Sequence, residues 1–117
     1  MIGHGPDGFM LWVEFEVDDP TEFAEASRAV RDSVARNEPG ISGYDWYWDD
    51  SRGRCHVLEI YDTSQAFIDH VKGEAAVVLL PGLERHAKLV RVEVHGCPSE
   101  KAKKVLIRNG GIMFHSM

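Results

Sequence analysis

Regular alternation of apolar and polar residues predicts four β-strands before residue 96. The clearest run extends from Phe9 to Val17, where every second residue is apolar. The other predicted strands cover Gly43 to Trp48, Cys55 to Tyr61 and Leu89 to His95. In the second strand the aromatic residues Tyr44, Trp46 and Trp48 share one face. Alternation alone does not indicate which face of that strand looks inward.

A strong helix start follows the first strand. Asp19 is expected at the N-cap and Pro20 at the first helical position, and apolar residues then recur at helical spacing to about Asn37. The proline of Glu38-Pro39-Gly40 cannot continue a helix and disfavours helical geometry at the residue before it. The first helix is therefore expected to end there.

A second helix start follows the third strand. Asp62 is expected as its N-cap with Gln65 three residues later, so the helix should begin at Thr63. An apolar cluster between Gly73 and Lys88 is then cut by Pro81-Gly82. This pattern predicts a short helix, a break and another helical turn.

The order of elements is β-α-β-β-α-β, which is typical of an α+β protein with a ferredoxin-like antiparallel sheet. We expect a single domain over residues 1–117, with a core over residues 9–95 and a C-terminal helix-strand extension over residues 96–117. One sheet face is nearly all aliphatic and is expected to carry the helices: Phe9, Leu11, Val13, Phe15, Val17, Leu58, Ile60, Val90, Val92 and Val94. The opposite face is expected to hold Trp12, Glu14, Val57, Glu59, Tyr61, Leu89, Arg91 and Glu93.

This opposite face is too apolar to be simply solvated and too charged to be a dry core. We expect a second copy of the chain to cover it, giving a homodimer whose paired sheets enclose a semi-polar chamber. Such a chamber would bind a small ligand, and burial would tune the ionisation of its side chains. The alternative is an ordinary solvated sheet face with scattered aromatic residues.

Composition excludes several classes of partner. The chain has 13 basic and 19 acidic side chains and a net charge of −6, which argues against nucleic acid or an anionic membrane as a partner. Cys55 and Cys97 are too few for a disulfide framework and lack the paired spacing of a zinc site. We therefore expect two unpaired thiols, no metal, and a cytoplasmic protein in a reducing compartment.

Several short motifs together resemble the antibiotic biosynthesis monooxygenase family. They are Glu38-Pro39-Gly40, Tyr44, Leu58-Glu59-Ile60-Tyr61-Asp62, Ala66-Phe67 and His70. The resemblance covers roughly Met10 to His95. It implies a ferredoxin-like protomer and a dimeric α/β barrel with the sheets face to face. It also implies insertion of molecular oxygen into a small aromatic or quinol-type substrate without a cofactor.

Oxygenation without a cofactor needs a base, a group that stabilises the resulting oxyanion, and exclusion of water. Glu59 is expected to be the base, and Arg91 or Tyr61 to stabilise the anion. His70, at the family's histidine position, is expected to shuttle a proton. The expected substrate-binding residues are Trp12, Glu14, Trp46 and Val57.

Each of these roles has a structural alternative. Glu59 and Arg91 would instead form an ion pair across the sheet, which also perturbs pKa values. His70 would instead interact with a helix dipole or an interface. The aromatic residues Trp12, Trp46 and Tyr61 would instead serve packing.

The sequence is compatible with two other functions. One is a non-catalytic dimeric protein that binds a small molecule, because fold does not fix function. The other is a haem-binding or haem-degrading protein of the same fold. Resemblance to those relatives implies an asparagine on the first strand, a tryptophan at position 70 and an axial histidine about ten residues later. This chain has Val13-Glu14, His70 and Leu80 at those places, with His86 as the nearby histidine.

Overall fold

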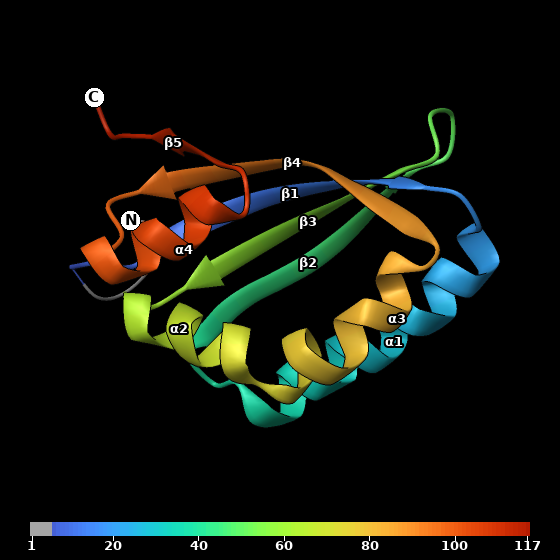
Figure 1. Cartoon of the computed structure of the whole chain (residues 1–117), viewed down its shortest axis with the longest axis horizontal. Coiled ribbons are helices and arrows are strands. Elements are labelled where there is room, and N and C mark those ends of the chain that lie inside the picture. Colours follow the sequence, from blue (N-terminus) through green and yellow to red (C-terminus); the bar gives the residue numbers. More distant parts are fainter. Residues whose placement is uncertain (1–5) are drawn as a thin grey trace.

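The computed structural model describes residues 6–117 as one five-stranded sheet covered by helices on one side (Figure 1). In chain order the elements are β1 (Phe9–Val17), α1 (Pro20–Asn37), β2 (Ile41–Asp49), β3 (Arg54–Tyr61), α2 (Ser64–Lys72), the π-helix η1 (Ala75–Leu79), α3 (Leu80–Glu84), β4 (Ala87–Gly96), α4 (Glu100–Arg108) and β5 (Gly111–Phe114). The strand order is β2-β3-β1-β4-β5. This arrangement confirms the predicted α+β, ferredoxin-like fold with a C-terminal helix and strand.

The first strand and helix form as the pattern predicts. Along β1 the residues facing the helices are buried, from Phe9 at the start to Val17 at the end. The carboxylate of Asp19 caps α1 by accepting a hydrogen bond from the backbone N–H of Glu22 at 3.2 Å. Amphipathic α1 then packs its apolar side, which includes Phe23, on the sheet.

The predicted facing of β3 was wrong. Glu59 pairs with Leu11 across the sheet and Tyr61 pairs with Phe9, and directly opposed residues share a face. Val57, Glu59 and Tyr61 therefore look toward the helices, together with Cys55. The residues on the outer face of β3 are His56, Leu58 and Ile60. Both sides of this strand carry apolar residues, so its sequence fits either orientation until the pairing with β1 selects one.

A β-bulge overturns the predicted facing of two residues in β4. Arg91 pairs with Glu14 while Leu89 pairs with Phe15, so the register shifts by one residue between these pairs. Val90 is the extra residue. The shift turns Leu89 to the helix side and leaves Val90 more than a third exposed, contrary to the strict alternation expected from the sequence.

The second helix begins one residue later than predicted. The hydroxyl of Thr63, not the carboxylate of Asp62, accepts the capping hydrogen bond from the backbone N–H of Ala66 at 3.1 Å. Gln65 does not reach back to complete a capping box, because its Nε2 donates to Asp69 Oδ1 at 2.9 Å.

The predicted helix break at Pro81 is absent. The π-helical turn η1 leads directly into α3, and the N–H of Leu80 donates to the carbonyl of Ala75, five residues back. Pro81 then stands in the first turn of α3. Pro81 has no N–H to donate, so the helical hydrogen bonds skip one residue here without ending the helix.

The C-terminal extension both covers and lengthens the sheet. In α4 the side chains of Ala102 and Leu106 are buried, and β5 adds a parallel strand beside β4. The backbone N–H of Ser99 donates to the hydroxyl of Ser64 at 2.8 Å, which ties the start of α4 to α2. The extension is therefore integrated with the helical layer.

Candidate functional site

A cavity of about 430 Å³ lies between the sheet and its own helices. Apolar side chains from β1, β4 and α4 form much of its wall, and exposed Glu84 and Asn109 mark its solvent side. Polar side chains lie where β2, β3 and α2 meet: Tyr44, Glu59, Tyr61 and His70. This volume and mixture of walls are typical of a site for a small organic ligand.

Glu59 and Tyr61 form a buried hydrogen-bonded pair in this cavity. The Tyr61 hydroxyl donates to Glu59 Oε1 at 2.5 Å, and the tyrosine ring packs between Phe9 and Phe67 with both centroid distances at 5.3 Å. Glu59 is 8% exposed and Tyr61 is fully buried. The packing around Tyr61 fixes the orientation of its hydroxyl, which leaves Glu59 Oε2 for a ligand.

Burial dominates the electrostatics of this pair. It raises the pKa of Glu59, although the nearby His70 and the Tyr61 hydrogen bond act in the opposite direction. Burial followed by the Glu59 charge raises the pKa of Tyr61. Burial, Glu59 and Glu38 likewise raise the pKa of Tyr44, which lies directly opposite Glu59 on β2. The phenols therefore stay protonated as hydrogen-bond donors, and the carboxyl group is moved toward the range of a general base.

A second polar pair extends the site toward α1. His70 Nδ1 lies 2.6 Å from Glu38 Oε1, so the imidazole donates its Nδ1–H to the carboxylate. Nε2 is the ring nitrogen that remains for a ligand. His70 shares a helix face with Phe67, which precedes it by three residues, and its ring centroid lies 5.8 Å from that of Tyr61.

Local packing explains why Glu38 and His70, which are far apart in the sequence, lie in contact. Pro39 ends α1, and Glu38 is its C-cap. Gly40 then lets the chain pass close to α2, because a Cβ atom there would lie only 2.7 Å from Cβ of Ala66. The backbone N–H of Asp62 also donates to the Gly40 carbonyl at 3.0 Å. These contacts hold Glu38 against the last turn of α2.

The structure divides the predicted site residues between the two faces of the sheet. Glu59, Tyr61, His70, Trp46 and Val57 all line the cavity. Trp12, Glu14 and Arg91 lie on the outer face, because they occupy the alternate positions of β1 and β4. Arg91 therefore cannot stabilise an anion in this cavity, and Trp12 and Glu14 do not line it.

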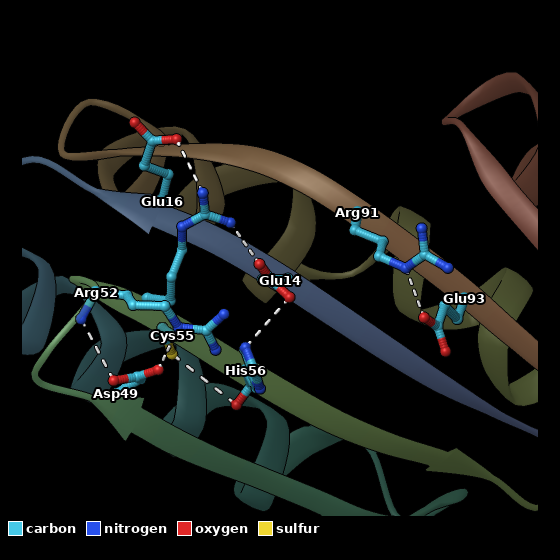
Figure 2. Close-up of polar contacts among 9 residues, drawn as sticks. Glu14, Glu16, Asp49, Arg52, Cys55, His56, Arg91 and Glu93 are labelled. Carbon is cyan, nitrogen blue, oxygen red and sulfur yellow. Dashed lines mark hydrogen bonds and ion pairs between the residues drawn. The ribbon is translucent and has the colours of Figure 1, made fainter.

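The predicted ion pair between Glu59 and Arg91 is also absent. Arg91 Nε instead donates to Glu93 Oε2 at 2.5 Å (Figure 2). Hydrogen bonds from Arg91 and then from His95 lower the pKa of Glu93. The sheet itself separates Arg91 from Glu59.

Glu14 is the centre of a second polar group on the outer face. Its carboxylate accepts a hydrogen bond from Arg54 Nη1 at 2.5 Å, while His56 Nε2 lies 3.2 Å from Glu14 Oε1 (Figure 2). The His56 contact has ion-pair distance but not hydrogen-bond alignment. The His56 ring also packs edge-on against Trp12, with centroids 4.6 Å apart.

Trp46 supplies a further polar group at the cavity. Its indole Nε1 is buried and has no hydrogen-bond partner within residues 6–117. Buried donors are normally paired, so this N–H is an exception, and the Trp46 ring lines both this cavity and a second pocket beside α1. The tyrosine beside it, Tyr44, packs against it edge-on at 5.7 Å.

Sequence reasoning assigned no role to Glu38 or Tyr44, although both belong to the motifs that carry the family resemblance. The available signal was the motif Glu38-Pro39-Gly40 followed by Tyr44. Glu38 and His70 are 32 residues apart, and only the folded contact between α1 and α2 brings them together.

Residues 6–117 include both cysteines and most of the side chains that could hold a metal ion. Cys55 and Cys97 are free, as predicted, and burial raises the pKa of Cys55 to about 11. Residues 6–117 contain no cluster of histidine, cysteine and acidic side chains arranged to hold a metal ion. None of the helices within that range has the length and apolar character required to span a bilayer.

The sheet order and helical layer define a small ferredoxin-like α+β protein with an internal ligand-sized cavity. The family model for antibiotic biosynthesis monooxygenase matches residues 11–78, more than half of the chain. The chain therefore belongs to the antibiotic biosynthesis monooxygenase family, as the motifs predicted. No protein of curated function matches it.

Solved structures share the fold over most of the chain. MupZ from Pseudomonas fluorescens is 25% identical, with a TM-score of 0.72 and coverage of 94% of this chain and 90% of that one. A candidate antibiotic biosynthesis monooxygenase from Caulobacter crescentus CB15 is 21% identical (TM-score 0.66; coverage 76% and 89%). SnoaB, a cofactor-independent oxygenase from Streptomyces nogalater, is 16% identical (TM-score 0.66; coverage 75% and 90%).

Proposed function

We propose that this protein is a cofactor-independent monooxygenase that acts on a small aromatic or quinol-type substrate. Molecular oxygen is the oxidant, and the deprotonated substrate is the reductant. One oxygen atom forms a new carbon–oxygen bond in the product, and the other leaves as water with two hydrogens taken from the substrate. Membership of the antibiotic biosynthesis monooxygenase family supports this class of reaction.

The observation that carries the proposal is the buried Glu59–Tyr61 pair in the cavity. Glu59 takes the substrate proton, because its raised pKa makes it a stronger proton acceptor than a solvated carboxylate. The Tyr44 hydroxyl, which remains protonated, stabilises the developing oxyanion, while the single O–H of Tyr61 stays bonded to Glu59 and orients its carboxylate. Tyr44 thus takes the oxyanion role predicted for Arg91 or Tyr61.

The other cavity residues position the substrate. Trp46 offers its indole N–H to a substrate oxygen and its ring to a flat apolar body, and Val57 packs beneath it. The apolar wall excludes water, which strengthens the electrostatic interactions inside and protects a reactive carbanion or peroxide. His70 carries protons within the cavity.

We also propose that the protein is a homodimer joined through the outer face of the sheet. Half-buried apolar residues on that face support this arrangement: Met10, Trp12, Leu58 and Ile60. The catalytic cavity lies on the opposite side of the sheet in each protomer. Dimerisation would therefore cover the sheet face that does not line the cavity. The chamber between sheets predicted from the sequence is not needed for the reaction.

Oxygen consumption with a panel of phenols and quinols, with and without a metal chelator, tests the activity. Glu59→Gln and Tyr61→Phe should each lower kcat by about 10²-fold, because the first removes the base and the second removes the hydrogen bond that orients it. Glu93→Gln is the matched control, since it changes a strand carboxylate on the outer face and should retain wild-type turnover.

The results separate the proposal from its alternatives. Turnover at the wild-type rate in Glu59→Gln would exclude this residue as the base. Binding of phenols without oxygen consumption would favour a non-catalytic small-molecule-binding protein. Loss of activity on chelation would point to a metal-dependent reaction.

A further inference from the structure

His70 lies between the internal cavity and a pocket on the protein surface. The imidazole lines the cavity, whereas its partner Glu38 lines a separate surface pocket of about 350 Å³. That surface pocket lies between the end of α1 and the outer side of α2, with Gly73 and the exposed Asp69 among its residues. The His70–Glu38 hydrogen bond therefore joins two spaces that α2 separates.

The geometry of the pair suits proton transfer. Nδ1 and Oε1 are 2.6 Å apart, and both side chains are only 12% exposed. A short hydrogen bond to a charged acceptor is stronger than an ordinary one. Because bulk water is largely excluded from the pair, a proton leaving His70 in this direction passes to Glu38.

The second carboxylate oxygen of Glu38 provides the connection to solvent. Oε2 is buried and has no hydrogen-bond partner within residues 6–117, which is costly for a carboxylate unless water reaches it. Gly73 leaves room beside it, because a Cβ atom at position 73 would lie 3.7 Å from Oε2. The surface pocket lies beside Glu38, so a small outward movement near Gly73 would bring water to Oε2.

We propose that Glu38 and His70 form a proton relay that connects the cavity with the surface pocket while a ligand occupies the cavity. The direct route through the cavity opening is then blocked by the ligand. The relay depends on the proposed function in one respect: the proton that it carries comes from the acidic O–H or C–H group of the substrate.

The transfer steps balance over one turnover. Outward, the substrate proton taken by Glu59 passes to His70 Nε2, the Nδ1 proton moves to Glu38 Oε1, and Glu38 releases a proton to water. This leaves the imidazole in the opposite tautomer. Inward, the same steps run in reverse when the peroxide oxygen is protonated and leaves as water. Oxygenation takes up no net proton, so one outward and one inward transfer restore His70 without rotation of its ring.

The relay can be tested without any oxygenase turnover. 4-Nitrophenol serves as the cavity ligand, and its absorbance follows protonation of the bound phenolate after a rapid shift from alkaline to neutral pH. Glu38→Gln keeps an oxygen that accepts the Nδ1–H but cannot carry a proton. It should slow protonation of the bound phenolate by about tenfold or more without changing its affinity.

Asp69→Asn is the matched control. It removes a carboxylate from the same surface pocket, but this carboxylate accepts a hydrogen bond from Gln65 and does not contact His70. It should retain the wild-type rate. Gly73→Ala provides a second variant, since the added methyl makes only ordinary contacts but fills the space beside Glu38 Oε2. It should slow protonation less than Glu38→Gln does.

Protonation of bound 4-nitrophenol at the wild-type rate in Glu38→Gln would overturn the relay, as would equal slowing in Asp69→Asn. Should Glu38→Gln fail to fold, a wild-type rate in Gly73→Ala would overturn it instead. Slowed protonation in a protein that consumes no oxygen with any substrate would support the relay and refute the proposed monooxygenase activity. The two proposals therefore fail separately.

Discussion

At the scale of single residues, Glu59 is the most unusual feature of the core. It is a carboxyl group on the helix side of a central strand, where its neighbours in the register are aliphatic or aromatic. Its one described hydrogen bond comes from Tyr61. A buried acid of this kind reduces stability whenever it ionises, and such groups are concentrated at functional sites.

The raised pKa of Glu59 predicts a pH-dependent stability difference from Glu59→Gln. Below the pKa of the unfolded chain, glutamate is protonated in both states and the variant should differ little from wild type. As pH rises toward the folded-state pKa, only the unfolded state ionises, so wild-type stability falls relative to Glu59→Gln. Urea denaturation at acidic and mildly alkaline pH should show that this difference grows with pH.

The exposed glutamate Glu74 offers the control. Glu74→Gln should show a much smaller change in relative stability over the same pH range, because this side chain is exposed in the folded protein and is not transferred out of water on folding. A stability difference for Glu59→Gln that is equal at both ends of the range would contradict the assigned burial effect.

Sequence reasoning could identify Glu59, Tyr61 and His70 because the family motifs contain them. It could not place them in one cavity, since this depends on which face of β3 meets the helices. It also missed the contact between Glu38 and His70, because nothing local in either segment encodes a pairing across 32 residues. The sequence therefore predicted which residues belong to the site, but only the fold shows which of them contact one another.

At the scale of elements, strands and helices follow from local patterns, but their relative orientation does not. The alternation in β1 is unambiguous because only one side is uniformly apolar. In β3 both sides carry large apolar residues, and the wrong choice moved Glu59 and Tyr61 to the outer face. The bulge at Val90 has no sequence signal in a run of alternating residues, because one extra residue changes facing without changing composition.

The close contact of Gly40 with α2 gives a prediction for the element that positions Glu38. Gly40→Ala would place a methyl group 2.7 Å from Ala66 Cβ, so either the turn or the helix must shift. We expect a loss of about 1–3 kcal/mol in unfolding free energy, the usual effect of overpacking. The shift should also weaken the His70–Glu38 hydrogen bond, which ¹⁵N NMR of the His70 imidazole would detect.

Gly82→Ala is the control for this substitution. A Cβ atom at Gly82 in α3 has no neighbour within 4 Å, and alanine favours a helix more than glycine does. This variant should be neutral or stabilised. Equal stability of Gly40→Ala and wild type would show that the turn is loose and that the close approach does not position Glu38.

At the scale of the whole molecule, the sheet has one face covered by helices and one face left uncovered in the protomer (Figure 1). The uncovered face is organised into two parts. Apolar residues gather around Trp12 and Leu58, which oppose each other in the register. Polar contacts centred on Glu14 and Glu93 lie alongside them (Figure 2). An apolar centre with charged neighbours is typical of a protein–protein interface.

If this face joins two protomers, a charge at its apolar centre should separate them. Leu58→Lys would bury an unpaired ammonium against the second sheet, a change that commonly costs several kcal/mol and greatly weakens association. In the isolated protomer the same side chain is partly exposed, so folding should persist. Sedimentation velocity should therefore show a dimer for the wild type and a folded monomer for Leu58→Lys.

Val78→Lys, on the exposed side of η1, should remain dimeric. A monomeric wild type would leave the outer face solvated while the cavity inside each protomer stays intact, so loss of the dimer proposal would not remove the proposed acid–base site.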